Sequence, residues 1–452
     1  MEDFWKPLQE VIEEKCSGFD HVWQTRKRVI TTHFLVIFIL KLVLSKNSQG
    51  YKVLLNELWE AEEFSHLQAS PISASSICEA RQKMPASIFS EINQRILAIR
   101  EESDPLPLWH NHRVFAVDGS KINLPRELLE AGYKAPNKDQ YYPQGLMSTL
   151  YHLGSGLVYD AILSANKGER ICLLAHMDRL LPGDVLVLDR GYFSYLILAK
   201  AVEKGINLVC RMQSGTVNKA VQAFWDSDKE DEVIIYKPSV AVKYESKKHG
   251  YDIELNPIKL RLIKYTINDE MYVCSTTLLE DKYSLNDFSA IYHSRWGIEE
   301  LYKISKVFVG IEDFHARSER GVKQEFYAHI LLINLARVFE IEAEKQLPLA
   351  EDNDDDDSDN SSDNHKDVYW KDFCGKIKKI KINFKNCLLV IGRSLGKLIF
   401  PICNEKFNCL VHILNSISRV WQTIRPGRHS PRQSRKPVGK WKSSNGGKVS
   451  YA

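Results

Sequence analysis

Apolar side chains recur three and four positions apart through the first part of the chain, the spacing that places them on one face of a helix. Four helices are predicted there, over Trp5–Ile12, Phe34–Leu44, Ser76–Met84 and Phe89–Ile99. Residues Ser76–Glu79 have the composition of a capping box at the start of the third helix. Few runs resemble strands, so we predict an all-α N-terminal domain over residues 1–108.

This helical domain has two interpretations. A compact helical unit with serine, arginine and lysine near the start of one helix is typical of a helix-turn-helix that reads DNA. A helical bundle without DNA contact explains the same pattern. The sequence alone does not choose between them.

From Arg113 the pattern changes to short apolar strands that alternate with helices. Strands are predicted at Val114–Asp118, Met147–Leu153, Leu157–Leu163, Val185–Asp189 and Ile206–Arg211, and helices at Glu169–Leu181 and Tyr195–Glu203. Gly154-Ser155-Gly156 joins the second and third strands as a hairpin. An antiparallel unit of three strands, then helix, strand, helix and strand, fits a ribonuclease-H-like α/β layout better than a Rossmann unit.

A β-rich segment follows at about residues 214–282. Its short strands are predicted at Glu232–Tyr236, Val240–Tyr244, Ile258–Thr266 and Met271–Thr276. A capping box, Ser284–Asp287, then opens a helix that we expect to run to about Phe308. The β-rich segment therefore stands between the strand that ends at Asp189 and this long helix.

The net charge of +3 conceals two opposed segments. Residues 351–367 hold nine acidic side chains and one lysine, so we predict an acidic linker over residues 346–367. Residues 419–452 hold nine Lys or Arg and no acid, at the end of a basic helical C-terminal region over residues 368–452. A basic tail on a nearly neutral body favours an anionic partner, nucleic acid ahead of a membrane.

Composition also argues against several classes of protein. The apolar run Phe34–Leu44 is interrupted by Lys41 and is shorter than the roughly 20 residues that span a bilayer. The chain opens Met1-Glu2-Asp3, acidic where a signal peptide is basic. Nine cysteines include no C-x-x-C pair, so we expect reduced thiols, no zinc finger and a cytoplasmic location.

Candidate chemistry begins with two aspartates at strand ends. Asp118 and Asp189 each close a predicted apolar strand, and α/β sheets commonly bind ligands beyond strand ends. Aspartate at such a position is also a common turn former. The two residues alone are therefore an ambiguous signal.

The helix that starts at Ser284 strengthens the signal. At about 100° per residue, five polar side chains fall within an arc of roughly 80° on one face: Tyr292, Arg295, Glu299, Tyr302 and Lys306. Glu300 points about 100° away and is expected in solvent. A surface helix with salt links is the ordinary explanation of such charges, but it does not explain a mixed stripe that faces two strand-end aspartates.

Three carboxylates suit a particular chemistry. Two divalent ions about 4 Å apart activate a nucleophile and stabilise the leaving oxygen of a phosphodiester. Hard Mg²⁺ or Mn²⁺ ions take oxygen ligands, and three carboxylates leave positions open for water and phosphate. Cations on the same helix face would bind DNA phosphates beside the metals.

The spacing Tyr292-x2-Arg295-x3-Glu299-x6-Lys306 resembles the Y-x2-R-x3-E-x6-K signature of DDE transposases in the IS-four family of bacterial insertion sequences. The contexts of the two aspartates resemble those of the same family: Val117-Asp118-Gly119-Ser120 and Leu188-Asp189-Arg190-Gly191-Tyr192. Later stretches do so too, at residues 310–312, 324–337 and 425–432. The resemblance covers roughly residues 110–345 and part of the tail.

The resemblance implies a ribonuclease-H-like DDE catalytic domain over residues 109–345, with the β-rich segment as its insertion. It implies that Asp118, Asp189 and Glu299 are catalytic and bind two Mg²⁺ or Mn²⁺ ions. Further residues would contact DNA phosphates or substrate: Tyr292, Arg295 and Lys306, then Arg190 and Tyr192. Trp296 would either stack on a displaced base or pack in the core.

The activity implied is cut-and-paste transposition of an insertion sequence, carried out by a homodimer on double-stranded element ends and target DNA. The location implied is a bacterial cytoplasm at the nucleoid, without a membrane partner. Two alternatives remain. One is a nuclease of the same fold that cleaves without strand transfer, and the other is an inactive, domesticated DNA-binding protein.

The basic tail generates a first prediction. Deleting residues 419–452 removes nine cations, which release counterions when they neutralise DNA phosphates. We expect weaker DNA binding and a flatter dependence of affinity on salt, by about 0.9 in logarithmic slope for each phosphate that the shortened protein no longer neutralises. Fluorescence anisotropy with a duplex at several salt concentrations measures both quantities. An unchanged slope would make the tail a solubility feature.

Overall fold

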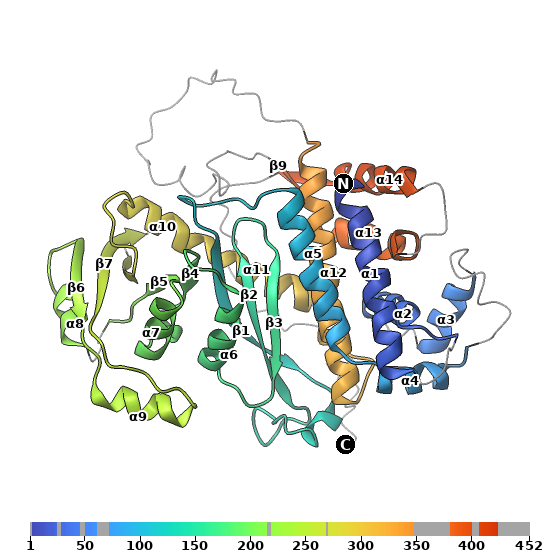
Figure 1. Cartoon of the computed structure of the whole chain (residues 1–452), viewed down its shortest axis with the longest axis horizontal. Coiled ribbons are helices and arrows are strands. Elements are labelled where there is room, and N and C mark those ends of the chain that lie inside the picture. The colour runs from blue at the N-terminus through green and yellow to red at the C-terminus, as the bar shows by residue number, and fades with distance from the viewer. Residues whose placement is uncertain are drawn as a thin grey trace, which may run out of the picture.

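Eight strands form one mixed sheet through the left and centre of Figure 1, and a group of helices packs beside it on the right. The order across the sheet is β3-β2-β1-β4-β5-β8-β7-β6. The strands are β1 (Val114–Asn123), β2 (Gln144–His152), β3 (Val158–Ser164), β4 (Val185–Leu188), β5 (Asn207–Arg211), β6 (Asp231–Tyr236), β7 (Ile258–Ile267) and β8 (Glu270–Thr276). The structure, a computed structural model, describes residues 2–24, 29–45, 50–60, 72–214, 218–267, 270–347, 380–399 and 406–423.

The first five strands confirm the predicted order. β1, β2 and β3 are antiparallel neighbours, and β4 and β5 continue the sheet parallel to β1. Helix α6 (Glu169–His176), followed by the short 3-10 helix η3 (Met177–Arg179), connects β3 to β4, and α7 (Tyr195–Glu203) connects β4 to β5. The apolar residues of the parallel strands are buried, as at Val185–Leu188, because helices cover both faces of these strands.

β1 is longer than expected and this matters for the site. It pairs with β2 along its whole length, from Phe115 to Asn123, but pairs with β4 only over Val114–Ala116. Asp118 therefore lies inside β1, and the prediction that it ends the strand is wrong. Past Ala116, the side of β1 that faces β4 has no strand beside it, which leaves an open edge next to Asp118.

The β-rich segment extends this same sheet. β8 pairs with β5, and β7 and β6 follow outward, with α8 (Lys219–Trp225) and α9 (Val240–Lys248) alongside. The prediction of a strand at Val240–Tyr244 is wrong, because these residues begin α9. Ser239 occupies the N-cap position with extended backbone but makes no side-chain capping hydrogen bond. The alanine, lysine and glutamate residues within the segment are helix formers.

The helix predicted over Ser284–Phe308 forms in three pieces. The capping box at Ser284 is confirmed and opens α10 (Leu285–Ser294), which Arg295 separates from α11 (Trp296–Lys303). A π-helical turn, η5 (Ile304–Val309), follows and ends at Gly310, whose φ of 75° suits glycine. The pieces still present one stripe toward the sheet.

Helices from both ends of the chain surround the long helix α12 (Glu319–Glu344) (Figure 1). They are α1 (Glu2–Trp23), α2 (Thr32–Leu44), α3 (Tyr51–Glu60), α4 (Ala74–Lys83) and α5 (Ser87–Ser103), then α13 (Phe384–Ile399) and α14 (Lys406–Ser418). The predicted capping box at Ser76 is wrong, because α4 starts earlier and Ser73 caps it. α5 buries one face against α1 and α12.

The helices join the sheet at its β3 edge. The side-chain amide of Asn334 accepts a hydrogen bond from Val158 N at 2.8 Å and donates one to Val158 O at 2.7 Å. Asn93 of α5 donates to the same carbonyl at 3.3 Å. These buried amides bond both backbone groups of Val158, so they cover the free edge of β3 at its first residue and set α12 against the sheet.

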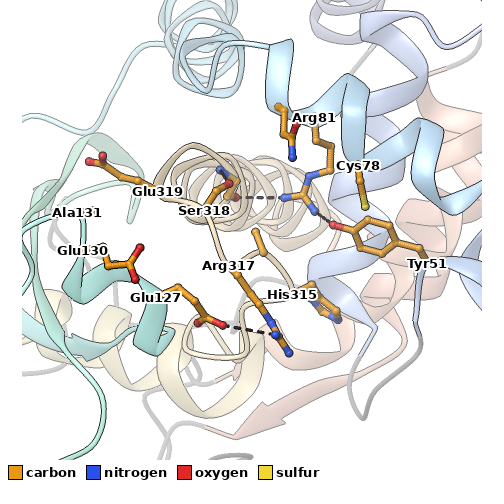
Figure 2. Close-up of a pocket in the computed structure, with 13 residues that line it drawn as sticks. Tyr51, Cys78, Arg81, Glu127, Glu130, Ala131, His315, Arg317, Ser318 and Glu319 are labelled. Carbon is orange, nitrogen blue, oxygen red and sulfur yellow. Dashed lines mark hydrogen bonds and ion pairs between the residues drawn. The ribbon is translucent and has the colours of Figure 1, made fainter.

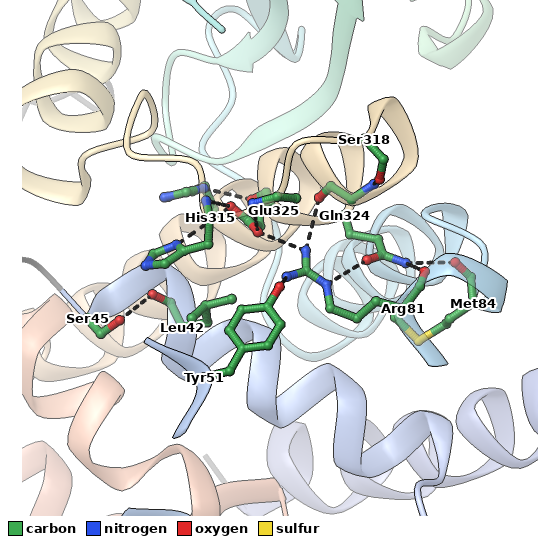
Figure 3. A network of polar contacts seen from close by, with 12 residues as sticks. Leu42, Ser45, Tyr51, Arg81, Met84, His315, Ser318, Gln324 and Glu325 are labelled. Atoms are coloured by element: carbon green, nitrogen blue, oxygen red, sulfur yellow. Dashed lines mark hydrogen bonds and ion pairs between the residues drawn. The ribbon is translucent and has the colours of Figure 1, made fainter. Parts of the chain in front are cut away.

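A buried ion pair fixes α4 on the start of α12 (Figure 3). Arg81 Nη2 lies 2.8 Å from Glu325 Oε1, and both side chains are at most 4% exposed. Arg81 also bonds Gln324, Gly321 O and Tyr51 OH, and the backbone N–H groups of His315 and Ala316 donate to Glu325. Burial acts to raise the pKa of Glu325, but Arg81 and His315 outweigh it and lower that pKa to about 2.

Several expectations concern residues outside those described. The acidic run 351–367, lysines 376–379 and the tail beyond Thr423 fall there. A short two-stranded sheet, β9 (Ile380–Ile382) with β10 (Trp421–Thr423), precedes that tail, so a deletion that begins after Thr423 spares it. Within the described ranges every cysteine is free, as expected, and no helix is both long and apolar enough to span a bilayer.

The Arg81–Glu325 pair generates a stability prediction. Glu325→Gln leaves a buried arginine without its counter-charge, which typically costs about 3–5 kcal/mol. Urea unfolding at pH 7 measures this loss. Glu319→Gln, on the same helix, removes only an exposed i,i+4 pair with Lys323 and should cost less than about 0.5 kcal/mol.

The same comparison has a pH dependence. Because the pKa of Glu325 is lowered to about 2 from an ordinary 4.5, its contribution is complete above the ordinary value and is lost as the pH falls toward 2. The difference between wild type and Glu325→Gln should therefore shrink in acid. Equal stability of the two proteins at pH 7 would show that the pair does not hold α4 on α12.

Candidate active site

Asp118 lies on the face of the sheet that α11 covers. Its register partner on β2 is Thr149, whose hydroxyl oxygen is 2.9 Å from the hydroxyl of Tyr302 on α11. Tyr302 also donates a hydrogen bond of 2.5 Å to the backbone carbonyl of Asp118. The tyrosine is buried, so these contacts fasten α11 directly over Asp118.

Asp189 follows β4 directly and opens the 3-10 helix η4 (Arg190–Tyr192). The hydroxyl of Tyr292 on α10 donates to Asp189 Oδ1 at 3.1 Å. Because β4 is parallel to β1 and next to it, Asp189 comes out beside the open edge of β1. α10 and α11 thus contact the two aspartates through one tyrosine each.

Arg295, between α10 and α11, connects the acidic residues. Its Nη2 donates to Glu299 Oε1 at 2.8 Å, and the arginine is 7% exposed. Burial acts to lower the pKa of this guanidinium, but the ionisable oxygen groups around it raise that pKa overall: Tyr292, Asp189, Asp118 and Glu299. One buried cation is therefore held among carboxylates from β1, the end of β4 and α11.

The pKa of Asp118 is raised to about 6. Burial is the largest cause. A hydrogen bond from the Gly119 backbone and the charge of Arg295 oppose it, and the charges of Glu169 and Glu299 add to it. Since no other described side chain bonds its carboxylate, Asp118 is an acid that the fold leaves without full compensation.

The predicted phosphate-binding residues fall into two groups. Tyr292 and Arg295 are buried and hold acidic side chains, which does not fit their prediction as direct phosphate contacts. Lys306 is half-buried and donates to Ser120 Oγ at 2.8 Å and to Lys121 O at 2.7 Å, and burial lowers its pKa. Its ammonium therefore stays close to β1, two residues beyond Asp118.

Arg190 and Tyr192, which follow Asp189, also differ in their exposure to solvent. Arg190 is exposed and free to meet a ligand, whereas Tyr192 is 2% exposed and its buried hydroxyl has no hydrogen-bond partner. Trp296 is 55% exposed, with its ring 5.4 Å from that of His293, so the interpretation of Trp296 as a core residue is wrong.

The acids do not form a ready metal-binding group. Among the described residues, no three His, Cys, Asp or Glu side chains are close enough together to hold an ion. The donor set nevertheless fits Mg²⁺ or Mn²⁺, because it consists of hard carboxylate oxygens. The negative charge of the three carboxylates exceeds the positive charge of Arg295, the one arginine among them. The buried hydroxyl of Tyr192, which has no hydrogen-bond partner, lies nearby. For an ion to be shared, Glu299 must release Arg295.

Sequence reasoning missed Glu169, the first residue of α6. Its charge acts on Asp118, and its side chain lies against Gly119. The sequence gives little indication of this contact, because a glutamate after Gly168 is typical of an ordinary helix start. Thr149 was missed as well, since nothing in a buried strand marks one threonine as the partner of Tyr302.

A second polar group resembles a nucleophilic triad. Ser148 Oγ lies 3.0 Å from His176 Nε2, and His176 Nδ1 lies 2.7 Å from Asp160 Oδ2. Ser148 and His176 have no exposed surface, so no substrate reaches this serine. The group instead ties the end of α6 to β2 and β3.

A pocket of about 740 Å³ lies elsewhere, between α3 and α4 on one side and the loop before α12 on the other (Figure 2). Arg81 and Tyr51 form one wall, and Glu127, 3.5 Å from Arg317, forms another. None of the predicted site residues lines it. This pocket and the acidic site are therefore distinct places in the fold.

Comparison with known proteins adds one assignment. Residues 109–335, which hold Asp118, Asp189 and Glu299, match the family described as Transposase DDE domain. No protein of curated function matches. Among solved structures, the chain is similar to a piggyBac transposase synaptic complex with hairpin DNA studied by cryo-EM, at 11% identity and a TM-score of 0.41, over 92% of this chain and 84% of that one.

The raised pKa of Asp118 predicts how the metal-free protein responds to pH. The folded state holds the Asp118 proton more tightly than the unfolded chain, so this residue costs stability above about pH 6 and not below its ordinary value of 3.8. Asp118→Asn should stabilise the protein at pH 8 by up to about 3 kcal/mol and should have little effect at pH 4. Urea unfolding in EDTA at both pH values measures the difference.

The exposed Asp139 provides a matched control. Asp139→Asn should leave stability unchanged at both pH values. If Asp118→Asn destabilised the protein equally at pH 4 and pH 8, Asp118 would be an ordinary structural residue whose ionised form does not cost stability.

Proposed function

The chain belongs to the Transposase DDE domain family, and from this membership we propose that it is a metal-dependent transposase that cuts DNA strands and transfers them. The observation that carries the proposal is that three acids lie where one helical stripe meets two adjacent parallel strands. Asp118 of β1 and Asp189 at the end of β4 contact this stripe through Tyr302 and Tyr292. Glu299 lies on the stripe itself and is bonded by Arg295. The finer assignment to the IS-four family and its cut-and-paste reaction is part of this proposal.

Asp118, Asp189 and Glu299 would hold the divalent ions. Such ions activate a water or a DNA 3′-hydroxyl and stabilise the leaving oxygen of the phosphodiester. Tyr292 keeps Asp189 oriented, and Tyr302 keeps α11 over β1. We propose a ribonuclease-H-like description for the strands β1–β5, which bring the aspartates together.

Arg295 has a distinct role in this proposal. In the metal-free protein it supplies positive charge where the acids would otherwise repel one another. A guanidinium no longer bonded to Glu299 would be available to a DNA phosphate, for which its planar fork is suited. The phosphate contact predicted for Arg295 would then belong to the DNA-bound state.

Exposed cations around the acids supply a path for the DNA backbone. Arg190 follows Asp189, and Lys121 lies beside the ammonium of Lys306 on β1. Trp296 stands exposed on the same helix as Glu299 and provides a flat ring on which an unpaired base can stack. We propose that these residues contact the strand being cut, and that the protein acts on DNA as a homodimer.

The acids generate the activity prediction. Metal ions supply several kcal/mol of transition-state stabilisation, and about 1.4 kcal/mol is a factor of ten in rate. Asp189→Ala and Glu299→Gln should therefore lower Mg²⁺-dependent strand cleavage by about a thousandfold or more, with DNA binding nearly intact. Glu300→Gln, which changes the exposed neighbour of Glu299, should cleave as wild type does.

The substrate is a DNA fragment that carries the sequences flanking the gene, and products are resolved on denaturing gels. Nicks followed by joining to a second DNA support a transposase, whereas nicks without joining support the nuclease of the same fold. Binding without nicking by the wild-type protein would favour the inactive DNA-binding protein. Wild-type cleavage rates in Asp189→Ala would contradict the assignment of the acids.

A further inference from the structure

The open edge of β1 is reached from both faces of the sheet. Asp118 faces α11, as its partner Thr149 does, whereas the next residue, Gly119, pairs with Ser148, which bonds His176 of α6. Side chains at adjacent positions of a strand point to opposite faces. Because β4 no longer pairs with β1 past Ala116, no strand separates the two faces on that side.

Glu169 occupies this position from the α6 side. A β-carbon built on Gly119 would lie 2.8 Å from Cγ of Glu169 and 2.9 Å from its Oε1, closer than real β-carbons approach other atoms. Glycine is therefore what allows the Glu169 carboxylate to lie against β1. The residue before this glycine is Asp118, and the charge of Glu169 acts on it.

The Glu169 carboxylate is not needed to hold α6 in place. Among the described contacts it has no hydrogen bond and no ion pair, although Glu169 is the first residue of the helix. The start of α6 is fastened by Arg170, whose Nε donates to Gly191 O at 2.9 Å. Its end is fastened by His176, which bonds Ser148 and Asp160. A glutamate in the first turn favours the helix dipole, but this does not account for its contact with Gly119.

A buried hydroxyl beside these acids lacks a partner. Tyr192 is 2% exposed and its oxygen has no hydrogen bond. Burial and the charges of Glu169 and Asp118 raise its pKa, so the hydroxyl stays protonated next to two carboxylates. A buried hydroxyl left without a partner costs free energy, and an ordered water or hydrated ion in this space would satisfy it.

The geometry points to Glu169 as a fourth carboxylate of the active site, which binds, directly or through a water shared with Tyr192, a divalent cation that Asp118 also holds. This inference rests on the proposed metal-dependent function. Acids would then lie on both faces of the sheet around one open strand edge. Gly119, which has no side chain, would leave the space that the glutamate occupies.

Binding of Mn²⁺ to the full-length protein tests this assignment. Free Mn²⁺ is counted by electron paramagnetic resonance during titration, with and without a nonspecific duplex. Glu169→Gln should weaken the tighter Mn²⁺ site by about tenfold to a hundredfold, a range typical when a supporting ligand is removed. Gly119→Ala, which leaves no room for Glu169 against β1, should weaken it in the same direction.

Controls separate this inference from the proposed function. Glu300→Gln should bind Mn²⁺ as wild type does, and thermal melting in EDTA should show Glu169→Gln folded and as stable as wild type, because its carboxylate has no protein partner. If Asp189→Ala loses Mn²⁺ binding while Glu169→Gln keeps it, Glu169 is not a ligand and the proposed function stands. If the wild-type protein binds no Mn²⁺ under either condition, both are overturned.

Discussion

One buried cation holds together a site whose other charges repel each other. Asp118, Asp189 and Glu299 come from three elements, and like charges gathered in a partly buried place disfavour the folded state. Arg295 is 7% exposed, bonds Glu299 and is acted on by all three acids. The acids can therefore assemble before any metal is present. Burial is the main cause of the raised pKa of Asp118, and the charge of Arg295 offsets that rise only in part.

Strand length gives this arrangement its shape. β1 continues to Asn123 while its pairing with β4 stops at Ala116, so the sheet has an open edge at Asp118. Helices reach that edge from both faces, α11 through Tyr302 and α6 through Glu169. Farther away, the Arg81–Glu325 pair joins α4 to α12. The Asn334 amide joins α12 to β3. The segment that matches the transposase family and the terminal helices thus share one continuous apolar core.

Sequence reasoning succeeded where a pattern was local or had a fixed spacing. Periodicity located β2, β3, β4 and α7, and the capping box at Ser284 is present. The helical stripe does face the two aspartates, since Tyr292 bonds Asp189 and Tyr302 bonds Asp118 O. It failed where distant residues decide. The length of β1 depends on pairing with β2, and the contact of Glu169 with Gly119 joins residues fifty positions apart.

Anomalous scattering from a crystal of the protein grown with Mn²⁺ decides whether Asp118, Asp189 and Glu299 share divalent ions. We predict peaks among these three carboxylates, with oxygen ligands at about 2.0–2.3 Å and with Glu299 turned away from Arg295. The prediction would be contradicted if a crystal saturated with Mn²⁺ showed no peak among these carboxylates and kept the Arg295–Glu299 pair intact.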